Sequence, residues 1–118
     1  MPLKDLQPGE TILKEESAIY LKSKINIQPG WLVLTNKRLV FIKSWNYLFG
    51  LIGLLFKSLR GGKLFDIPLK EIHTYSNEKY GLNKKVLGLE TEKEGHIKFA
   101  LSSQYRGWEQ YLMQVIKK

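Results

Sequence analysis

The 118-residue chain contains no cysteine, which excludes disulfide bonds, thiolate metal sites and cysteine nucleophiles. Hydrophobic residues make up 43% of the sequence and charged residues 25%. This balance is typical of a folded globular protein rather than a disordered one. A chain of this length can bury a core without covalent or metal cross-links, so we expect one domain over residues 1–118.

The sequence also lacks a hydrophobic run long enough to cross a membrane. The longest run, Tyr47–Phe56, has ten residues, whereas a membrane-spanning helix needs about twenty. The first residues, Met1–Asp5, do not show a basic start followed by an apolar stretch, so no signal peptide is visible. We therefore expect a cytoplasmic protein, whose membrane contact, if it has any, is peripheral and at the inner face.

Acidic residues are missing from a long internal segment. Between Ser17 and Phe65 there is no Asp or Glu, so the eight Lys and Arg residues of this segment account for the net charge of +8. Segregated positive charge favours an anionic partner, which can be a phospholipid surface, an acidic protein or nucleic acid. We take these eight residues as candidates for binding a lipid headgroup: Lys22, Lys24, Lys37, Arg38, Lys43, Lys57, Arg60 and Lys63.

Groups suited to catalysis or metal binding are scarce. The two histidines, His73 and His96, lie near a predicted strand start and beside a predicted turn, without a catalytic spacing, so we interpret both as surface residues. Glu90, Glu92 and Glu94 alternate along a predicted strand and form a solvated face, because calcium requires about six converging oxygens. We predict no enzyme activity, no catalytic residue, no metal site and no cofactor.

Apolar residues alternate over most of residues 11–101, which predicts a mainly β protein. Trp31–Thr35 and Arg38–Ile42 are predicted to form a hairpin, because only Asn36 and Lys37 lie between them. An earlier strand is expected near Ile19–Ile27, and Gln28-Pro29-Gly30 is expected to form the turn that follows it.

The second half of the chain predicts another hairpin and a helix. Val86–Thr91 and His96–Leu101 flank a turn at Glu94-Gly95, and two short strands are expected before them, at 64–67 and 72–76. Residues 105–115 carry one apolar stripe at helical spacing, with Ser102 or Ser103 available as a cap. The predicted core contains Leu32, Leu34, Leu39, Phe41, Ile67, Leu87, Leu89, Ile97, Phe99, Trp108 and Leu112.

Residues 44–63 break the alternation and predict a helical apolar insertion between the third and fourth strands. Wound as a helix, the segment has a wide apolar face, which can meet a membrane or pair with another copy of the chain. It can also cover strand 38–42, which is apolar on both faces, since Val40 and Ile42 point away from Leu39 and Phe41. The candidate residues for membrane or oligomer contact are Trp45, Tyr47, Leu48, Phe49, Leu51, Ile52, Leu55, Phe56 and Leu59.

Three segments, Leu6–Glu10, Gly30–Phe41 and Phe65–Ile72, resemble the pattern of GRAM domains and their bacterial PH-like relatives, and Trp108–Leu112 is similar to the closing helix of that family. The resemblance covers nearly the whole chain, although the insertion departs from the pattern. It implies a PH-like fold, in which two packed antiparallel sheets form a seven-stranded, partly open barrel capped by a C-terminal α-helix. It also implies a lipid-binding or protein-binding role, since most members of the family are not enzymes.

Charge, insertion and resemblance together predict a non-enzymatic binding module that associates peripherally with anionic lipid membranes. A self-associating or protein-binding module that does not contact lipid is the alternative, and it includes a homo-oligomer. Nucleic-acid binding through the basic face is a third class. It is the least favoured, because Trp31 and Phe41 are typical of a core and no RNA-binding signature is present.

Overall fold

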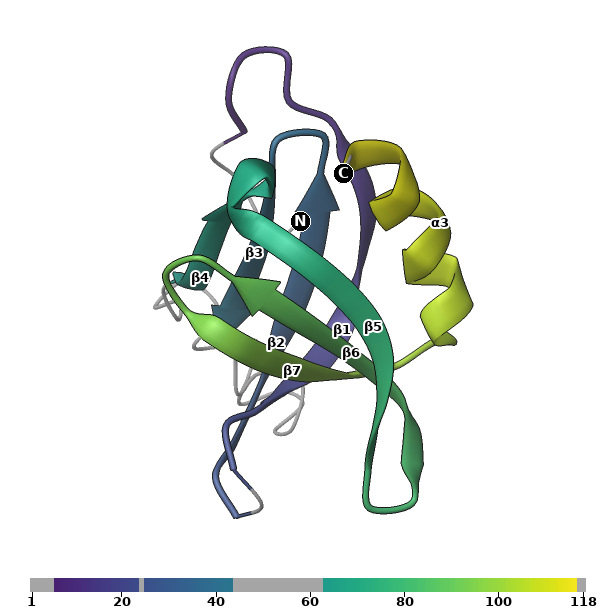
Figure 1. The fold of residues 1–118 in the computed structure, drawn as a ribbon. Helices are drawn as coiled ribbons and strands as arrows, with labels where there is room; N and C mark the ends of the chain where they lie inside the picture. The colour runs from purple at the N-terminus through teal and green to yellow at the C-terminus, as the bar shows by residue number, and fades with distance from the viewer. Residues whose placement is uncertain (1–5, 24, 44–62, 117–118) are drawn as a thin grey trace, which may run out of the picture.

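A computed structural model describes residues 6–23, 25–43 and 63–116 (Figure 1). Within these residues the chain forms strands that are joined mostly by tight connections, then a C-terminal helix. The elements are β1 (Ile12–Leu21), β2 (Ile27–Thr35), β3 (Arg38–Lys43), β4 (Lys63–Pro68), the 3-10 turn η2 (Leu69–Glu71), β5 (Ile72–Tyr80), β6 (Asn83–Thr91), β7 (Gly95–Leu101) and α3 (Tyr105–Val115).

The strands form one antiparallel sheet in the order β4-β3-β2-β1-β7-β6-β5. The sheet curls into a half-barrel, which leaves β4 and β5 as its two edges (Figure 1). The pairing of β1 with β7 joins the two halves and is short, running from Ala18 opposite Leu101 to Tyr20 opposite Phe99. Helix α3 lies against the curled sheet and contacts β1 and β6. The predicted seven-stranded, partly open barrel with a C-terminal helix is therefore confirmed.

The inside of the barrel contains every predicted core residue. Trp108 and Leu112 of α3 are fully buried among side chains from the sheet, which confirms the helical stripe as a core face. Aromatic rings fill the centre, where the ring centroids of Phe41 and Phe99 lie 5.1 Å apart and those of Tyr20 and Phe65 lie 4.8 Å apart. Burial of these large side chains provides the main favourable free energy of folding.

A second buried cluster lies on the outer face of β2 and β3. Val33 and Val40 are fully buried there, with three partly buried apolar side chains packed against them, namely Ile12, Trp31 and Ile42. The sequence-based expectation that β3 is apolar on both faces is thus confirmed. The predicted insertion and all its candidate contact residues lie outside the described residues, except for Lys63, which begins β4.

The structure corrects the predicted turn at Gln28-Pro29-Gly30. These residues lie inside β2 and pair with residues 18–20 of β1, and the chain turns earlier, between Lys22 and Asn26. Gly30 serves close packing rather than turning, because a Cβ at this position would lie 2.3 Å from the carbonyl oxygen of Ile42. The glycine therefore marks a close approach of β2 and β3 rather than a turn.

The strand expected near Ile19–Ile27 is displaced, because β1 runs over Ile12–Leu21 and the chain already turns between Lys22 and Asn26. β5 is longer than expected, since it continues past Ser76 to Tyr80 before the chain returns as β6. The turn between β5 and β6 was not predicted from the sequence. It contains Gly81, whose φ of 63° lies in the left-handed region that favours glycine. The resulting β5–β6 hairpin reaches the same end of the barrel as the β1–β2 connection (Figure 1).

The start of α3 also differs from the prediction. Gln104 is the N-cap residue, and no side chain caps the helix from that position. Instead the Glu16 carboxylate accepts hydrogen bonds from the backbone N–H groups of Ser102 and Ser103, at 2.9 and 3.1 Å, and from the Ser103 hydroxyl at 2.6 Å. A carboxylate on β1 thus ties the start of the helix to the barrel.

Candidate anion-binding pocket

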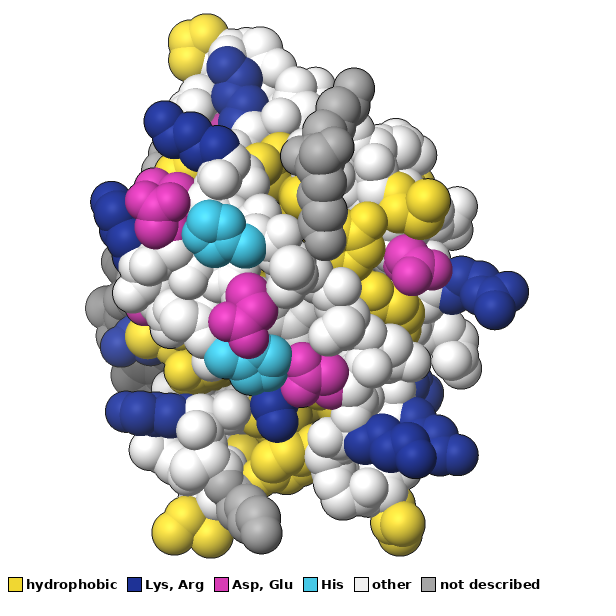
Figure 2. Space-filling view, viewed as in Figure 1, with side chains coloured by type: hydrophobic (Ala, Val, Ile, Leu, Met, Phe, Trp, Pro, Cys, Tyr) yellow, Lys and Arg dark blue, Asp and Glu magenta, His cyan; other side chains and the backbone are white. Residues whose placement is uncertain are grey.

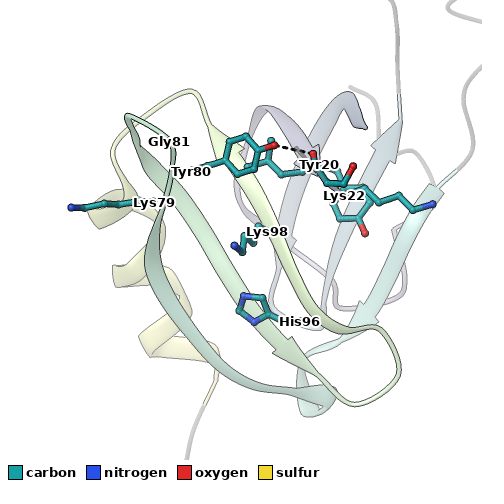
Figure 3. A pocket seen from close by; sticks show the side chains of 9 residues that line it. Tyr20, Lys22, Lys79, Tyr80, Gly81, His96 and Lys98 are labelled. Carbon is teal, nitrogen blue, oxygen red and sulfur yellow. Dashed lines mark hydrogen bonds between the residues drawn. The ribbon is translucent and has the colours of Figure 1, made fainter. Parts of the chain in front are cut away.

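A pocket of about 630 Å³ opens between the β1–β2 connection and the β5–β6 hairpin (Figure 3). Its floor belongs to β7. There His96 and Lys98 face outward, because Ile97 and Phe99 between and beside them are buried in the core. The lining residues are Tyr20, Leu21, Lys22 and Ser23 on one side, Lys79, Tyr80 and Gly81 on the other, and His96 and Lys98 below.

A hydrogen bond joins the two rims of the pocket. The Tyr80 hydroxyl donates to the carbonyl oxygen of Ser23 at 2.9 Å. The β1–β2 rim is itself ordered locally, because the N–H groups of Lys22 and Ser23 donate to the carbonyl oxygen of Asn26, each at 3.1 Å. Asn26 in turn donates its N–H to the Ser23 hydroxyl at 3.1 Å. The two rims are therefore held in a fixed relation.

Three lysines surround the opening. Lys22 and Lys79 stand on the two rims and extend away from each other, and Lys98 lies between the rims (Figure 3). Within the described ranges, Lys22 and Lys79 form no ion pair, so their charges are not neutralised there. Lys98 Nζ lies 3.6 Å from Glu78 Oε1. The rims thus carry two lysine charges that no carboxylate of the described residues neutralises, which favours an anionic partner.

His96 lies between two carboxylates on the outer face of the barrel. Its Nε2 is 3.0 Å from Glu78 Oε2, and its Nδ1 is hydrogen-bonded to Glu90 Oε2. Figure 2 shows histidine and acidic side chains gathered on this face. Burial acts to lower the pKa of His96, but the hydrogen bonds with Glu78 and Glu90 outweigh it and raise the pKa above its usual value. The protonated ring fits this geometry, because a neutral imidazole can donate from only one nitrogen.

A glycine makes room for this arrangement. Glu78 lies over Gly88 of β6, where a Cβ would be only 1.9 Å from Glu78 Oε2. The register places Gly88 between Ser76 of β5 and Lys98 of β7. Burial acts to raise the pKa of Glu78, but the hydrogen bond with His96 and the charges around it lower the pKa overall. An ionised Glu78 can therefore bridge His96 and Lys98.

Of the five described residues among the basic candidates from the sequence, only Lys22 lines this pocket. Lys43 and Lys63 lie at the ends of β3 and β4, and the register places both near the start of β2, toward the β1–β2 connection. Lys63 Nζ is also 3.4 Å from Asp66 Oδ2. The remaining candidates of this part of the chain, Lys24, Lys57 and Arg60, lie outside the described residues.

Lys37 and Arg38 lie at the other end of the barrel. Arg38 is buried, and its guanidinium donates to both Glu10 oxygens, at 2.8 and 3.1 Å, and to Asp66 Oδ2 at 2.8 Å. The Thr35 hydroxyl also donates to Glu10, at 2.6 Å. The hydrogen bond from Arg38 opposes the effect of burial and lowers the pKa of Glu10 to about 2. The charge of Arg38 thus serves the fold, and we leave this residue out of the pocket.

Sequence reasoning missed Lys79, His96 and Lys98, because it looked for binding residues only in the segment without acids. A signal for two of them was present. The predicted alternation of β7, with Ile97 and Phe99 in the core, already places His96 and Lys98 together on the opposite face. No such signal relates them to Lys22, since that proximity depends on how the sheet curls.

Over residues 6–23, 25–43 and 63–116, no cluster of His, Asp and Glu side chains is suited to hold a metal ion. No helix in the same ranges has the length and apolar character needed to pass through a bilayer.

No family model and no curated protein matches the chain, but several solved structures share its fold. The C-terminal domain of an unknown protein from Leishmania infantum has a TM-score of 0.65 at 17% identity, covering 93% of this chain and 88% of that one. The Slm1 PH domain in complex with inositol-4-phosphate has a TM-score of 0.62 at 15% identity, covering 91% and 99%. The same domain in complex with phosphoserine has a TM-score of 0.56 at 15% identity, covering 88% and 91%. The chain therefore has a PH-like fold, whereas membership of the GRAM family is not shown.

Proposed function

We propose that the chain is a non-catalytic module that binds phosphorylated headgroups of anionic phospholipids and associates peripherally with the cytosolic face of a membrane. The observation that carries the proposal is that Lys22, Lys79, Lys98 and His96 all belong to the lining of one opening. The complex of the Slm1 PH domain with inositol-4-phosphate supports a phosphorylated ring as the ligand. A pocket of about 630 Å³ is large enough for such a group.

The expected chemistry is charge recognition by hydrogen bonds. Ammonium groups donate to phosphate oxygens in bonds about twice as strong as those between neutral groups. Lys22 and Lys79 stand on separate rims and would have to turn toward the opening to reach a phosphate there, while Lys98 lies between the rims. His96, whose two ring nitrogens face Glu78 and Glu90, adds positive charge beside the ligand when it is protonated. Because the pocket is open to solvent, we expect moderate affinity for the free headgroup and further affinity from the membrane itself.

The test compares two double variants with equal changes of net charge. Lys22→Gln with Lys79→Gln removes the two rim charges, and Lys37→Gln with Lys70→Gln removes two exposed charges at the other end of the barrel. Binding is measured by sedimentation with phosphatidylcholine vesicles, with and without a phosphatidylinositol monophosphate. Each basic residue near an anionic surface contributes about 1 kcal/mol, so the rim variant should bind roughly thirtyfold more weakly. Equal losses in both variants would refute the pocket as the binding site.

A phosphorylated protein is the alternative ligand, because the Slm1 PH domain was also solved with phosphoserine. Competition between the vesicles and a soluble phosphoserine peptide separates the two. Membrane or oligomer contact by the insertion at 44–63, the single domain over 1–118, self-association and nucleic-acid binding stay predictions from the sequence. A gel shift at low salt tests nucleic-acid binding.

A further inference from the structure

The two hairpin tips beside the pocket carry large apolar side chains that the fold does not bury. Ile25, in the β1–β2 connection, is 95% exposed, and Leu82, in the β5–β6 turn, is 100% exposed. Among the described residues these are the two most exposed large hydrophobic side chains, and the next is Met113 of α3 at 62%. Full exposure of such residues has a cost in solubility and therefore calls for a reason.

The local turns do not supply that reason. In the β1–β2 connection, Ser23 and Asn26 make the hydrogen bonds that close the turn. In the β5–β6 turn, Gly81 adopts the positive φ. Turn tips favour Gly, Asn, Asp and Ser, so Ile25 and Leu82 occupy positions where polar residues would serve the fold equally well.

Both tips lie at the same end of the molecule, on either side of the pocket (Figure 1). Figure 2 shows hydrophobic side chains projecting at this end, with basic side chains close to them. Lys22 precedes Ile25, and Lys79, Lys84 and Lys85 flank Leu82 in the sequence. Over the described part of the chain these four lysines are exposed and form no ion pair.

We propose that Ile25 and Leu82 are paired membrane anchors, which enter the hydrocarbon boundary of an anionic bilayer on the two sides of the headgroup pocket. The proposal rests on the function proposed above and adds the orientation of the molecule on the membrane. Apolar tips with basic flanks are typical of segments that lie in a bilayer interface, where Lys meets phosphate and the apolar side chain passes below it. The bond between Tyr80 and Ser23 links the two hairpins, so both tips can enter together.

This pattern fits a bilayer better than a protein partner. The two side chains stand on separate tips with an anion-attracting opening between them, rather than in one continuous apolar patch. With both tips inserted, the pocket opening would face the layer of lipid phosphates. A lipid headgroup could then occupy the pocket while its acyl chains remain in the bilayer.

The test separates membrane anchoring from headgroup binding. The double variant Ile25→Asn with Leu82→Asn keeps the net charge and suits both turns. Met113→Asn is the matched control, because it removes an exposed apolar side chain on α3. We expect the double variant to lose about tenfold in vesicle affinity per side chain, since burial of roughly two methylene groups is worth that factor. Its affinity for soluble inositol monophosphate and its melting temperature should stay unchanged, and the control should bind vesicles like the wild type.

A direct readout uses the absence of cysteine, because a single introduced cysteine is labelled uniquely. A polarity-sensitive fluorophore on Leu82→Cys should shift to the blue with vesicles of phosphatidylcholine and a phosphatidylinositol monophosphate. The same label on Met113→Cys should not shift. An emission spectrum of the label at position 82 that does not shift when vesicles are added would overturn the anchor.

The remaining outcomes also decide the question. Unchanged vesicle affinity of the double variant overturns the anchors and leaves the pocket intact if soluble inositol monophosphate still binds. Loss of soluble binding in the double variant would mean that the tips shape the pocket, which overturns anchoring. If the wild type forms a dimer without lipid and the double variant is a monomer, the tips make contact between copies of the chain, which also overturns anchoring. Vesicle binding that needs both tips, without soluble binding by the wild type, would support the anchors and refute the headgroup pocket.

Discussion

Protonation of His96 should increase the affinity of the pocket for anions. The ring faces Glu78 of β5 and Glu90 of β6, and Lys98 of β7 reaches Glu78 from the same side. Folding raises the pKa of His96, so the stabilisation from its protonated form is fully present below the pKa of the unfolded chain. It is lost as the pH rises through the folded pKa. The affinity for an anion should likewise be higher at low pH and fall as the pH rises, because the proton on His96 adds a positive charge beside the ligand.

The size of the effect follows from distance and exposure. Two unit charges about 6 Å apart interact by about 1 kcal/mol at an effective dielectric of about 60, somewhat below that of water. The His96 side chain is 39% exposed, so this weak-interaction limit applies. A phosphate in the pocket should therefore bind about fivefold more tightly when His96 is protonated.

The assay is a titration of soluble inositol monophosphate across pH for the wild type and His96→Gln. The ligand itself titrates near pH 6 and gains negative charge as the pH rises, so only the ratio of the two affinities reports on the protein. The affinity of the wild type divided by that of His96→Gln should be about five at acidic pH and approach one at alkaline pH. His73→Gln is the control, because His73 is exposed and does not line the pocket. A ratio that stays constant with pH, or a similar profile for His73→Gln, would refute the reasoning.

Two further substitutions test the groups around these charges. Gly88→Ala should displace the flexible end of Glu78 with little loss of thermal stability, and it should reduce the pH dependence of anion binding as His96→Gln does. An unchanged pH profile would contradict this. Glu10→Gln should cost about 3 kcal/mol in urea unfolding at neutral pH, because buried Arg38 loses a charged partner. Since the folded pKa of Glu10 is about 2, its contribution should be present above its unfolded pKa and disappear as the pH falls toward 2. If the unfolding free energies of the wild type and of Glu10→Gln fell equally with acid, this role of the Glu10 carboxylate would be wrong.

The fold could be predicted from the sequence because its main signals are local. Alternation in β3 and β7 fixed which side chains enter the core, and the stripe on α3 fixed the helix face that is buried. Errors arose where one residue type serves two purposes. Gly30 and Pro29 are common in turns, but here both lie inside β2, where Gly30 permits a close approach of β3. The Glu16 carboxylate replaced the expected serine cap because β1 lies beside the start of α3, which no local pattern reveals.

The candidate site was harder to predict because a count of charges does not show which charges are neutralised. Arg38 belongs to the segment without acids, yet Glu10 and Asp66, both outside its hairpin, bind its guanidinium. Lys79 belongs to a part of the chain with no net charge, yet no ion pair of the described residues uses its ammonium group. The useful quantity is therefore the local excess of charge after pairing, and that requires the structure.

The decisive contact of the pocket is also the least local one. Tyr80 and Ser23 are 57 positions apart, and their hydrogen bond joins the hairpins of two strands that are not neighbours in the sheet. Each hairpin by itself offers a lysine and an exposed apolar tip, which is an ordinary surface feature. Curling of the sheet brings the two hairpins to the sides of β7, where His96 and Lys98 already face outward. Binding at this place thus depends on closure of the barrel, and loss of the β1–β7 pairing should remove the pocket before it unfolds either hairpin.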